Sequence, residues 1–298
     1  MYFSYLLRIG TAISIFASSL VFLVTPAHAQ TPESNIAKLH IDTASRQRML
    51  SQRMVKAVCF ISTGIEVAKH QKMLADAHDL FFNSNAALLT GSEELGFEPE
   101  KDPAVFAKLL RIDSLWEKFS PLLQDSMAGN PVNAEKLAEI NKLSLKILRV
   151  QNDAVQLIQE EYSKALDELP ETLARTIGLA GRQRMFTQEI SKDFCLIDAG
   201  VGVEEDIAEL AKAEAYFSST MDALLNGFSG VVLPAPTEEI RAKLEEVQKL
   251  WDGPKKVFLA VAAGAEISDA DRATIANDIE IVLTTMNEAV QMYDHVND

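Results

Sequence analysis

The sequence predicts an all-α protein that contains two tandem up-down-up-down four-helix bundles. Alanine, leucine, glutamate, lysine and glutamine dominate beyond residue 30, and strand-like alternating runs are few. This composition favours helices. A segment near the beginning of the chain also recurs 136 residues later. Such self-similarity indicates that one structural unit has been duplicated.

The repeat is clearest in one segment of each half. Residues 44–62, ASRQRMLSQRMVKAVCFIS, align without a gap on residues 180–198, AGRQRMFTQEISKDFCLID. Further along, Phe81 corresponds to Phe217 and, after the loss of one residue, Asn152 corresponds to Asn287. Chance does not produce this agreement, so the chain is a tandem duplication of a unit of about 135 residues.

Each unit is expected to contain four helices, separated by residues that cap or end them. Gly91 and Gly227 are typical of a helix end, whereas Asp102 followed by Pro103 is typical of a helix start. Pro121 and Pro254 are expected to kink or end the third helix of each unit. The expected helices are 34–66, 68–90, 103–127 and 133–167 in the first unit, and 171–200, 203–227, 237–264 and 269–296 in the second.

The beginning of the chain has the layout of a secretory signal peptide. Arg8 precedes the apolar stretch Ile9–Val24, and Ala27-His28-Ala29 resembles a cleavage site. We therefore predict a signal peptide over 1–29, a first unit over 30–169 and a second unit over 170–298. An uncleaved membrane anchor is the alternative, although the stretch is shorter than the roughly 20 residues of a spanning helix.

The charge and the motifs exclude several classes of protein. The net charge of −15 argues against binding nucleic acid or an anionic membrane, so an anion site would be a local exception. Glu-x-x-His pairs and a Cys-x-x-Cys-His haem motif are absent from the sequence. We therefore expect no metal, no cofactor and no enzymatic activity. The histidines His40, His70, His78 and His295 are expected to be solvated.

The first helix of each unit presents an unusual polar seam. Residues spaced alternately by four and three positions form a coiled-coil face, yet this face carries arginine and glutamine where such a seam favours leucine. A buried arginine is costly without a counter-charge, and two facing arginines are worse unless an anion or carboxylates lie between them. The seams are Ile41, Ser45, Arg48, Gln52, Val55 and Cys59, and Ile177, Gly181, Arg184, Gln188, Ser191 and Cys195.

The seam motifs resemble those of a known family. Ser45-Arg-Gln-Arg-Met-Leu-Ser-Gln-Arg53 and Gly181-Arg-Gln-Arg-Met-Phe-Thr-Gln188 look like the motif of the PilJ-type domain. That domain is the N-terminal sensor domain of type IV pili methyl-accepting chemotaxis transducers, and it is similar to the periplasmic sensor of nitrate/nitrite-responsive histidine kinases. The resemblance implies a sensor bundle in the periplasm that pairs through its first helix, so the two units would form a pseudo-dimer.

The resemblance also implies a ligand site. In the nitrate-sensing relatives, one motif arginine from each subunit grips a single anion on the dimer axis. By motif position these arginines are Arg48 and Arg184, preceded by Ser45 and Gly181, and Ser45 departs from the usual glycine. A planar oxyanion such as nitrate matches the guanidinium fork, and the amides of Gln52 and Gln188 could complete the site.

The two cysteines occupy the same repeat position. Cys59 and Cys195 each lie 11 residues after a motif arginine, on nearly the same helix face. If the first helices pair in parallel, both sulfurs approach the axis. We therefore predict a disulfide with Cα atoms roughly 4.4–6.8 Å apart. Two small buried thiols are the alternative.

Two functions compete at this point. The first is an exported, non-catalytic sensor that binds a small inorganic anion, nitrate or nitrite by family analogy, and signals through a membrane partner. The second is a structural or interaction bundle without a ligand, in which the arginines face solvent or are already paired with carboxylates.

Overall fold

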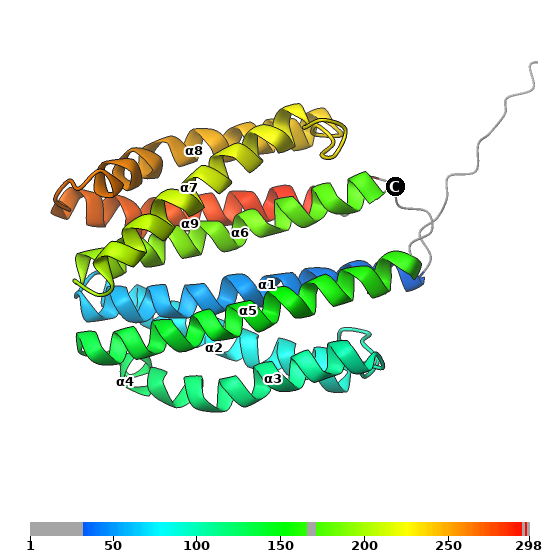
Figure 1. Ribbon diagram of the computed structural model, residues 1–298, viewed down its shortest axis with the longest axis horizontal. Helices are drawn as coiled ribbons and strands as arrows, with labels where there is room; N and C mark the ends of the chain where they lie inside the picture. Colours follow the sequence, from blue (N-terminus) through cyan, green and yellow to red (C-terminus); the bar gives the residue numbers. More distant parts are fainter. Residues whose placement is uncertain (1–31, 166–170, 294–295, 297–298) are drawn as a thin grey trace, which may run out of the picture.

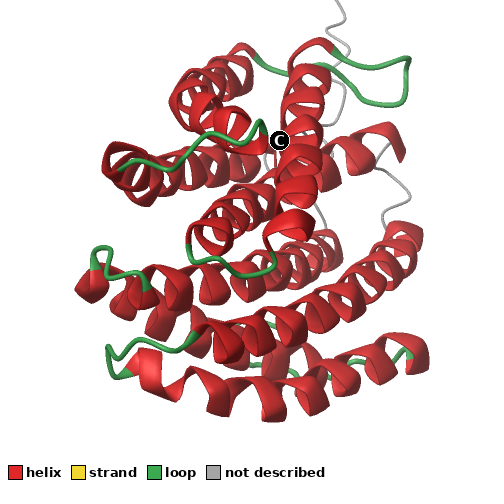
Figure 2. Ribbon diagram, turned by 60° about the vertical axis from the view of Figure 1, so that its left-hand side comes forward, coloured by secondary structure: helices red, strands yellow, loops and turns green. Residues whose placement is uncertain are grey.

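The structure, a computed structural model, describes residues 32–165, 171–293 and 296, and in these residues the regular elements are helices (Figures 1 and 2). The predicted signal peptide lies outside the described residues. No helix in the described part of the chain is long and apolar enough to cross a membrane. The first unit contains α1 (Pro32–Ser62), α2 (Val67–Thr90), α3 (Pro103–Phe119), a 3-10 turn (Ser120–Leu123), α4 (Gln124–Met127) and α5 (Ala134–Ala165), and the second contains α6 (Glu171–Asp198), α7 (Val203–Asn226), α8 (Glu238–Ala262) and α9 (Asp269–Tyr293).

The helices form two four-helix bundles that meet along their first helices. Helix α1 packs against α2 and α5 of its own unit, and α6 packs in the same way against α7 and α9. The two first helices lie side by side at the centre of the molecule and run in the same direction (Figure 1). The predicted fold class, two tandem bundles paired as a pseudo-dimer, is confirmed.

The predicted helix ends are present in both units. The Asp102 side chain accepts hydrogen bonds from the backbone amides of Ala104 and Val105, and it is followed by a proline in the first turn of α3. Gly91 ends α2 with a φ of +84°. A Cβ at this position would lie 2.9 Å from the carbonyl oxygen of Phe97, so only glycine fits the turn.

The two prolines behave differently from each other. Helix α3 ends at Phe119, and Pro121 lies in the 3-10 turn that follows, as expected. Pro254 does not end its helix, because α8 continues past it to Ala262. Its ring is buried in the bundle, and this packing offsets the backbone hydrogen bond that proline removes.

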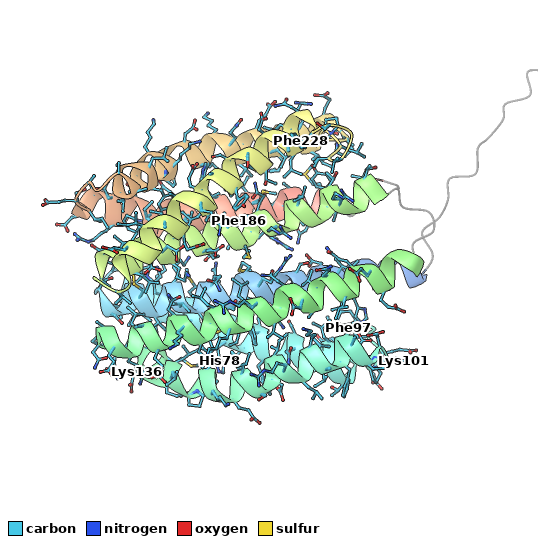
Figure 3. The ribbon with its side chains drawn as sticks, viewed as in Figure 1. His78, Phe97, Lys101, Lys136, Phe186 and Phe228 are labelled. Carbon is cyan, nitrogen blue, oxygen red and sulfur yellow. A yellow bond between two sulfur atoms is a disulfide. The ribbon has the colours of Figure 1, made fainter. Side chains whose placement is uncertain are left out.

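The expectation that the histidines are solvated is wrong for two of them. The His40 ring stacks on Phe97 and the His70 ring stacks on Phe60, with ring centroids 4.0 and 4.7 Å apart. Burial and then the charge of Lys56 lower the pKa of His70 to about 4, so His70 packs as a neutral ring. His78 is half-buried in the first unit, whereas Phe97 is buried (Figure 3), and His295 lies outside the described residues.

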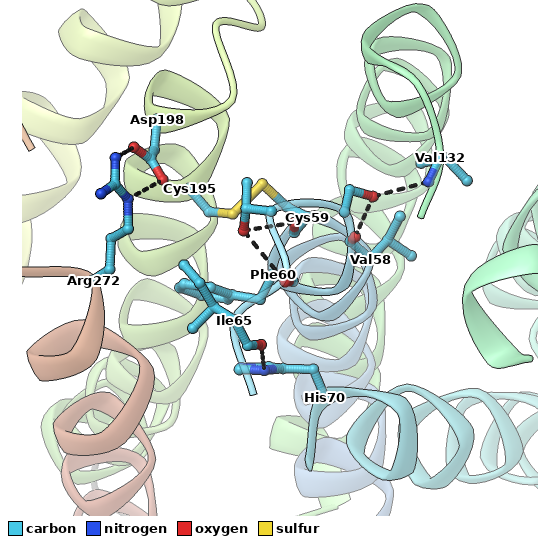
Figure 4. Close-up of a disulfide and its surroundings, with 11 residues drawn as sticks. Val58, Cys59, Phe60, Ile65, His70, Val132, Cys195, Asp198 and Arg272 are labelled. Atoms are coloured by element: carbon cyan, nitrogen blue, oxygen red, sulfur yellow. Dashed lines mark hydrogen bonds and ion pairs between the residues drawn. A yellow bond between two sulfur atoms is a disulfide. The ribbon is translucent and has the colours of Figure 1, made fainter. Parts of the chain in front are cut away.

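A disulfide joins the two units. Cys59 of α1 and Cys195 of α6 are bonded, with Cα atoms 6.1 Å apart (Figure 4). The predicted disulfide is thus present, and both of its residues are buried. Because the bond links equivalent positions of two parallel helices, it holds them in register.

Removing this disulfide should destabilise the protein without changing its fold. The bond closes a loop across 136 residues, and the chain entropy of so long a loop corresponds to about 3–5 kcal/mol. We expect the double variant Cys59→Ala and Cys195→Ala to lose that amount of unfolding free energy in guanidinium chloride. An unchanged unfolding free energy would show that the bond adds no constraint beyond the helix pairing.

Candidate functional site

The candidate site lies where α1 and α6 face each other. All six residues that the sequence singled out are buried there: Ser45, Arg48 and Gln52 on α1, and Gly181, Arg184 and Gln188 on α6. Each of the two arginines is about 2–3 % exposed. The interpretation that they simply lie on a solvent-exposed face is therefore excluded.

Each motif arginine is positioned by the same two contacts within its own unit. The Nε of Arg184 donates to the carbonyl oxygen of Gly181 at 3.5 Å, and its Nη1 donates to Oδ1 of Asn287 at 3.0 Å. Arg48 makes the equivalent contacts, to the carbonyl oxygen of Ser45 at 3.5 Å and to Oδ1 of Asn152 at 3.4 Å. The paired asparagines are visible as a repeat in the sequence, but nothing in the sequence showed that they hold the arginines.

The glutamine that precedes each motif arginine bonds its helix to the next helix of the same unit. The Gln47 amide nitrogen donates to the carbonyl oxygen of Phe81, and Gln183 donates to that of Phe217, at 3.0 and 2.8 Å. The duplicated motif therefore ties α1 to α2 and α6 to α7. This contact explains part of the motif without any ligand.

The two arginines differ in their counter-charges. The Nη2 of Arg184 forms an ion pair with Oδ1 of Asp42, which reaches across from α1, at 2.6 Å. Among the described residues, no carboxylate lies within 4.0 Å of the Arg48 guanidinium. Burial, followed by the positive charges of Arg182 and Arg184, lowers the pKa of Arg48 to about 9. Arg48 is therefore a buried and uncompensated cation.

The difference between the arginines originates in one pair of repeat positions. Asp42 lies six residues before Arg48, and the residue six before Arg184 is Gly178. The second unit therefore offers Arg48 no equivalent carboxylate. Burial raises the pKa of Asp42, but the charges of Arg184 and Arg46 outweigh burial, so its pKa stays below the ordinary value. Asp42 is therefore ionised at neutral pH.

The glutamines that were expected to complete the site make other contacts. The Gln52 amide nitrogen donates to the hydroxyls of Ser51 and Ser144, each at 3.2 Å. The Gln188 amide nitrogen donates to the hydroxyl of Thr187 at 3.4 Å, and its Oε1 accepts from Arg53 at the same distance. A role for Gln52 and Gln188 in ligand binding stays a prediction.

Comparison with known proteins identifies the family of the chain. The model of the PilJ family, described as the type IV pili methyl-accepting chemotaxis transducer N-terminal domain, matches residues 33–143 and 170–276. The chain belongs to the PilJ family. It contains two tandem copies of this domain, which is a domain of chemotaxis-transducer-like sensors. No curated protein matches the chain at a significant level.

A second buried ionic group links the two PilJ copies, one turn beyond the glutamines. Glu280 of α9 forms ion pairs with Lys56 and, at 2.7 Å, with Arg53, both on α1. At the repeat position of Lys56, the Lys192 ammonium contacts Asp193 at 2.9 Å and Asn141 of α5 at 3.3 Å. Sequence reasoning missed this group, because the carboxylates come from positions that are not repeated.

Within the described residues, no group of three or more histidine, cysteine, aspartate or glutamate side chains could hold a metal ion. The contacts of the motif arginines with other described residues include ion pairs and hydrogen bonds. Asp42 pairs with Arg184 and also with Arg46 of its own helix, whereas Arg48 has no carboxylate within 4.0 Å among the described residues.

Glu280 should make the stability of the protein depend on acid pH. Burial raises its pKa, but Lys56 and Arg53 outweigh burial and lower it to about 2. The stabilisation is complete above the ordinary value near 4.5 and is lost as the pH falls through about 2. We expect Glu280→Gln to lose about 3 kcal/mol of unfolding free energy at pH 7 and to flatten the dependence between pH 4.5 and 2, measured with urea. Glu288→Gln, which removes an exposed pair with Lys243, is the control and should match the parent.

The two motif arginines should affect stability in opposite directions. Arg48→Gln removes a buried, uncompensated charge, so we expect the melting temperature of the ligand-free protein to rise. Arg184→Gln leaves Asp42 without its partner across the interface, and we expect a loss of about 2–4 kcal/mol. Thermal unfolding in a buffer free of small oxyanions compares them. Equal losses of unfolding free energy in both variants would contradict the conclusion that only Arg184 has a counter-charge.

Proposed function

We propose that the protein is an exported sensor that binds a small planar anion between α1 and α6 and passes its state to a membrane partner. Nitrate or nitrite is the ligand by analogy with the sensors that the PilJ-type domain resembles. The observation that carries this proposal is the Arg48 guanidinium, which is buried and lacks a carboxylate partner among the described residues.

The energetic argument for a ligand is direct. Removing a cation from water costs several kcal/mol, and this cost is offset only when a counter-ion accompanies the cation. Here Asn152 and a backbone carbonyl supply two long hydrogen bonds, at 3.4 and 3.5 Å, and no negative charge. A bound oxyanion would supply the missing charge and accept hydrogen bonds along the planar edge of the guanidinium.

The remaining predictions about the chain belong to the same proposal. We propose that residues 1–29 are a signal peptide, that the units extend over 30–169 and 170–298, and that the mature protein works in the periplasm. The disulfide supports this location, because disulfides persist in oxidising compartments. A sensor domain of this family communicates with a signalling partner.

The alternative function, a helical interaction protein that has lost its ligand, has one observation in its favour. Arg184 is already paired with a carboxylate, Asp42, as that hypothesis requires. Arg48 does not fit it. The two hypotheses therefore differ at Arg48, and a binding measurement on this residue separates them.

Isothermal titration with nitrate and with nitrite tests the proposal. We expect the parent to bind one or both, and Arg48→Ala to bind roughly tenfold to hundredfold more weakly, since it loses charge-assisted hydrogen bonds. Arg111→Ala removes an exposed arginine of α3 and should bind as the parent does. Absence of binding by the parent would leave the interaction protein as the better description.

A further inference from the structure

This inference rests on the proposed function and concerns the position and number of the ligands. We propose that the Asp42 carboxylate acts as a built-in anion on Arg184, so that the protein has a single ligand site, centred on Arg48 and Gly178. The bound anion would then lie to one side of the pseudo-twofold axis. It would not bridge the two arginines.

The first argument comes from the atoms of the two guanidinium groups. In both arginines, Nε donates to a backbone carbonyl and Nη1 donates to an asparagine of the fourth helix. They differ at Nη2, which in Arg184 contacts Asp42 at 2.6 Å. In Arg48, Nη2 has no hydrogen-bond or ion-pair partner among the described residues. The Asp42 carboxylate thus marks where an anion binds a motif arginine of this fold.

The second argument comes from the symmetry of the paired helices. Asp42 reaches Arg184 across the interface, so the pseudo-twofold relation places Gly178 of α6 opposite Arg48. The disulfide between equivalent residues and the equivalent arginine–asparagine contacts show that this relation holds along the interface. Where the first unit supplies a carboxylate, the second unit supplies only a hydrogen atom. A ligand anion can therefore occupy the position of the missing side chain.

The third argument comes from what surrounds Gly178. Among the described residues, and apart from its own helix, the group within 4 Å of a Cβ built there is the amide nitrogen of Gln159 on α5, at 3.2 Å. This nitrogen is a hydrogen-bond donor and would suit an anion. Arg182, which is exposed, lies one helical turn beyond Gly178 on α6, and its charge lowers the pKa of Arg48. An amide donor therefore lies beside Gly178, and a cation lies one turn further along the same helix.

The chemical class of the ligand follows from the Asp42 carboxylate, which occupies the equivalent position on Arg184. A carboxylate is planar, carries one negative charge and presents two oxygens to the guanidinium fork. The matching free ligands are nitrate and nitrite among inorganic ions, and formate and acetate among small carboxylates. All four are planar monoanions, and titration with each of them shows which one the protein binds.

Reciprocal substitutions test the single site. Gly178→Asp copies Asp42 into the second unit, so we expect it to raise the melting temperature of the ligand-free protein and to weaken anion binding roughly tenfold to hundredfold. Gly178→Ala, its matched control, adds a Cβ 3.2 Å from the Gln159 amide nitrogen but no charge, so it should weaken anion binding less than Gly178→Asp does. Equal losses in the aspartate and alanine variants would contradict the proposal, because the carboxylate would then not be the cause.

The opposite substitution should create a second site. Asp42→Ala frees the Nη2 of Arg184, and we expect calorimetric stoichiometry to rise from one anion per chain to two. Asp76→Ala, which removes an exposed aspartate with an i−4 lysine partner, is the control and should bind one. Tighter binding of one anion by Asp42→Ala would mean that the ligand bridges both arginines, and the single-sided site would be wrong.

The outcomes separate this inference from the proposed function. If the parent binds none of the four anions, the proposed function itself fails. If the parent binds one anion and Gly178→Asp binds it equally well, the proposed function stands and the position assigned here is overturned. Circular dichroism of each variant confirms that the helices are intact.

Discussion

The interface between α1 and α6 buries positive charge where the two bundles pack together. Compensating this buried charge is the constraint on which the other contacts of the interface depend. A coiled-coil seam normally excludes water with leucine, whereas the first helices bury four cationic side chains: Arg48, Arg184, Lys56 and Lys192. Each buried cation needs compensation. Carboxylates from either unit supply it for three of the four, and the fourth is the motif arginine of the first unit.

Duplication within one chain makes this uneven compensation possible. In a homodimer every side chain appears twice, so an aspartate at position 42 would neutralise both arginines or neither. In the tandem chain, Asp42 corresponds to Gly178, and Glu280 corresponds to Leu145. Both carboxylates could therefore be acquired or lost in one half alone. The interface keeps its pseudo-twofold backbone while its charges have become asymmetric.

The sequence predicted the parts of the structure that are repeated, and it missed the parts that are not. The bundles, the caps at Asp102 and Gly91, the buried motif arginines and the Cys59–Cys195 disulfide follow from periodicity, turn chemistry and duplication. The partners of the arginines and lysines did not follow, because Asp42 and Glu280 lie far from them in sequence or in the other unit. Pairing across an interface is a three-dimensional property that one-dimensional spacing does not encode.

The position of the disulfide limits how the interface can respond to a ligand. Cys59 lies 11 residues beyond Arg48, about 16 Å along the helix, and about 40 Å from the start of α1. A covalent bond at one end of two parallel helices leaves the other end as the place where their spacing can change. A change in charge at Arg48 therefore acts between a fixed point at the sulfurs and a freer end at Pro32 and Glu171. That freer end holds the N-termini of both first helices, at Pro32 of α1 and Glu171 of α6. A partner that detects the ligand would gain most by contacting the molecule there.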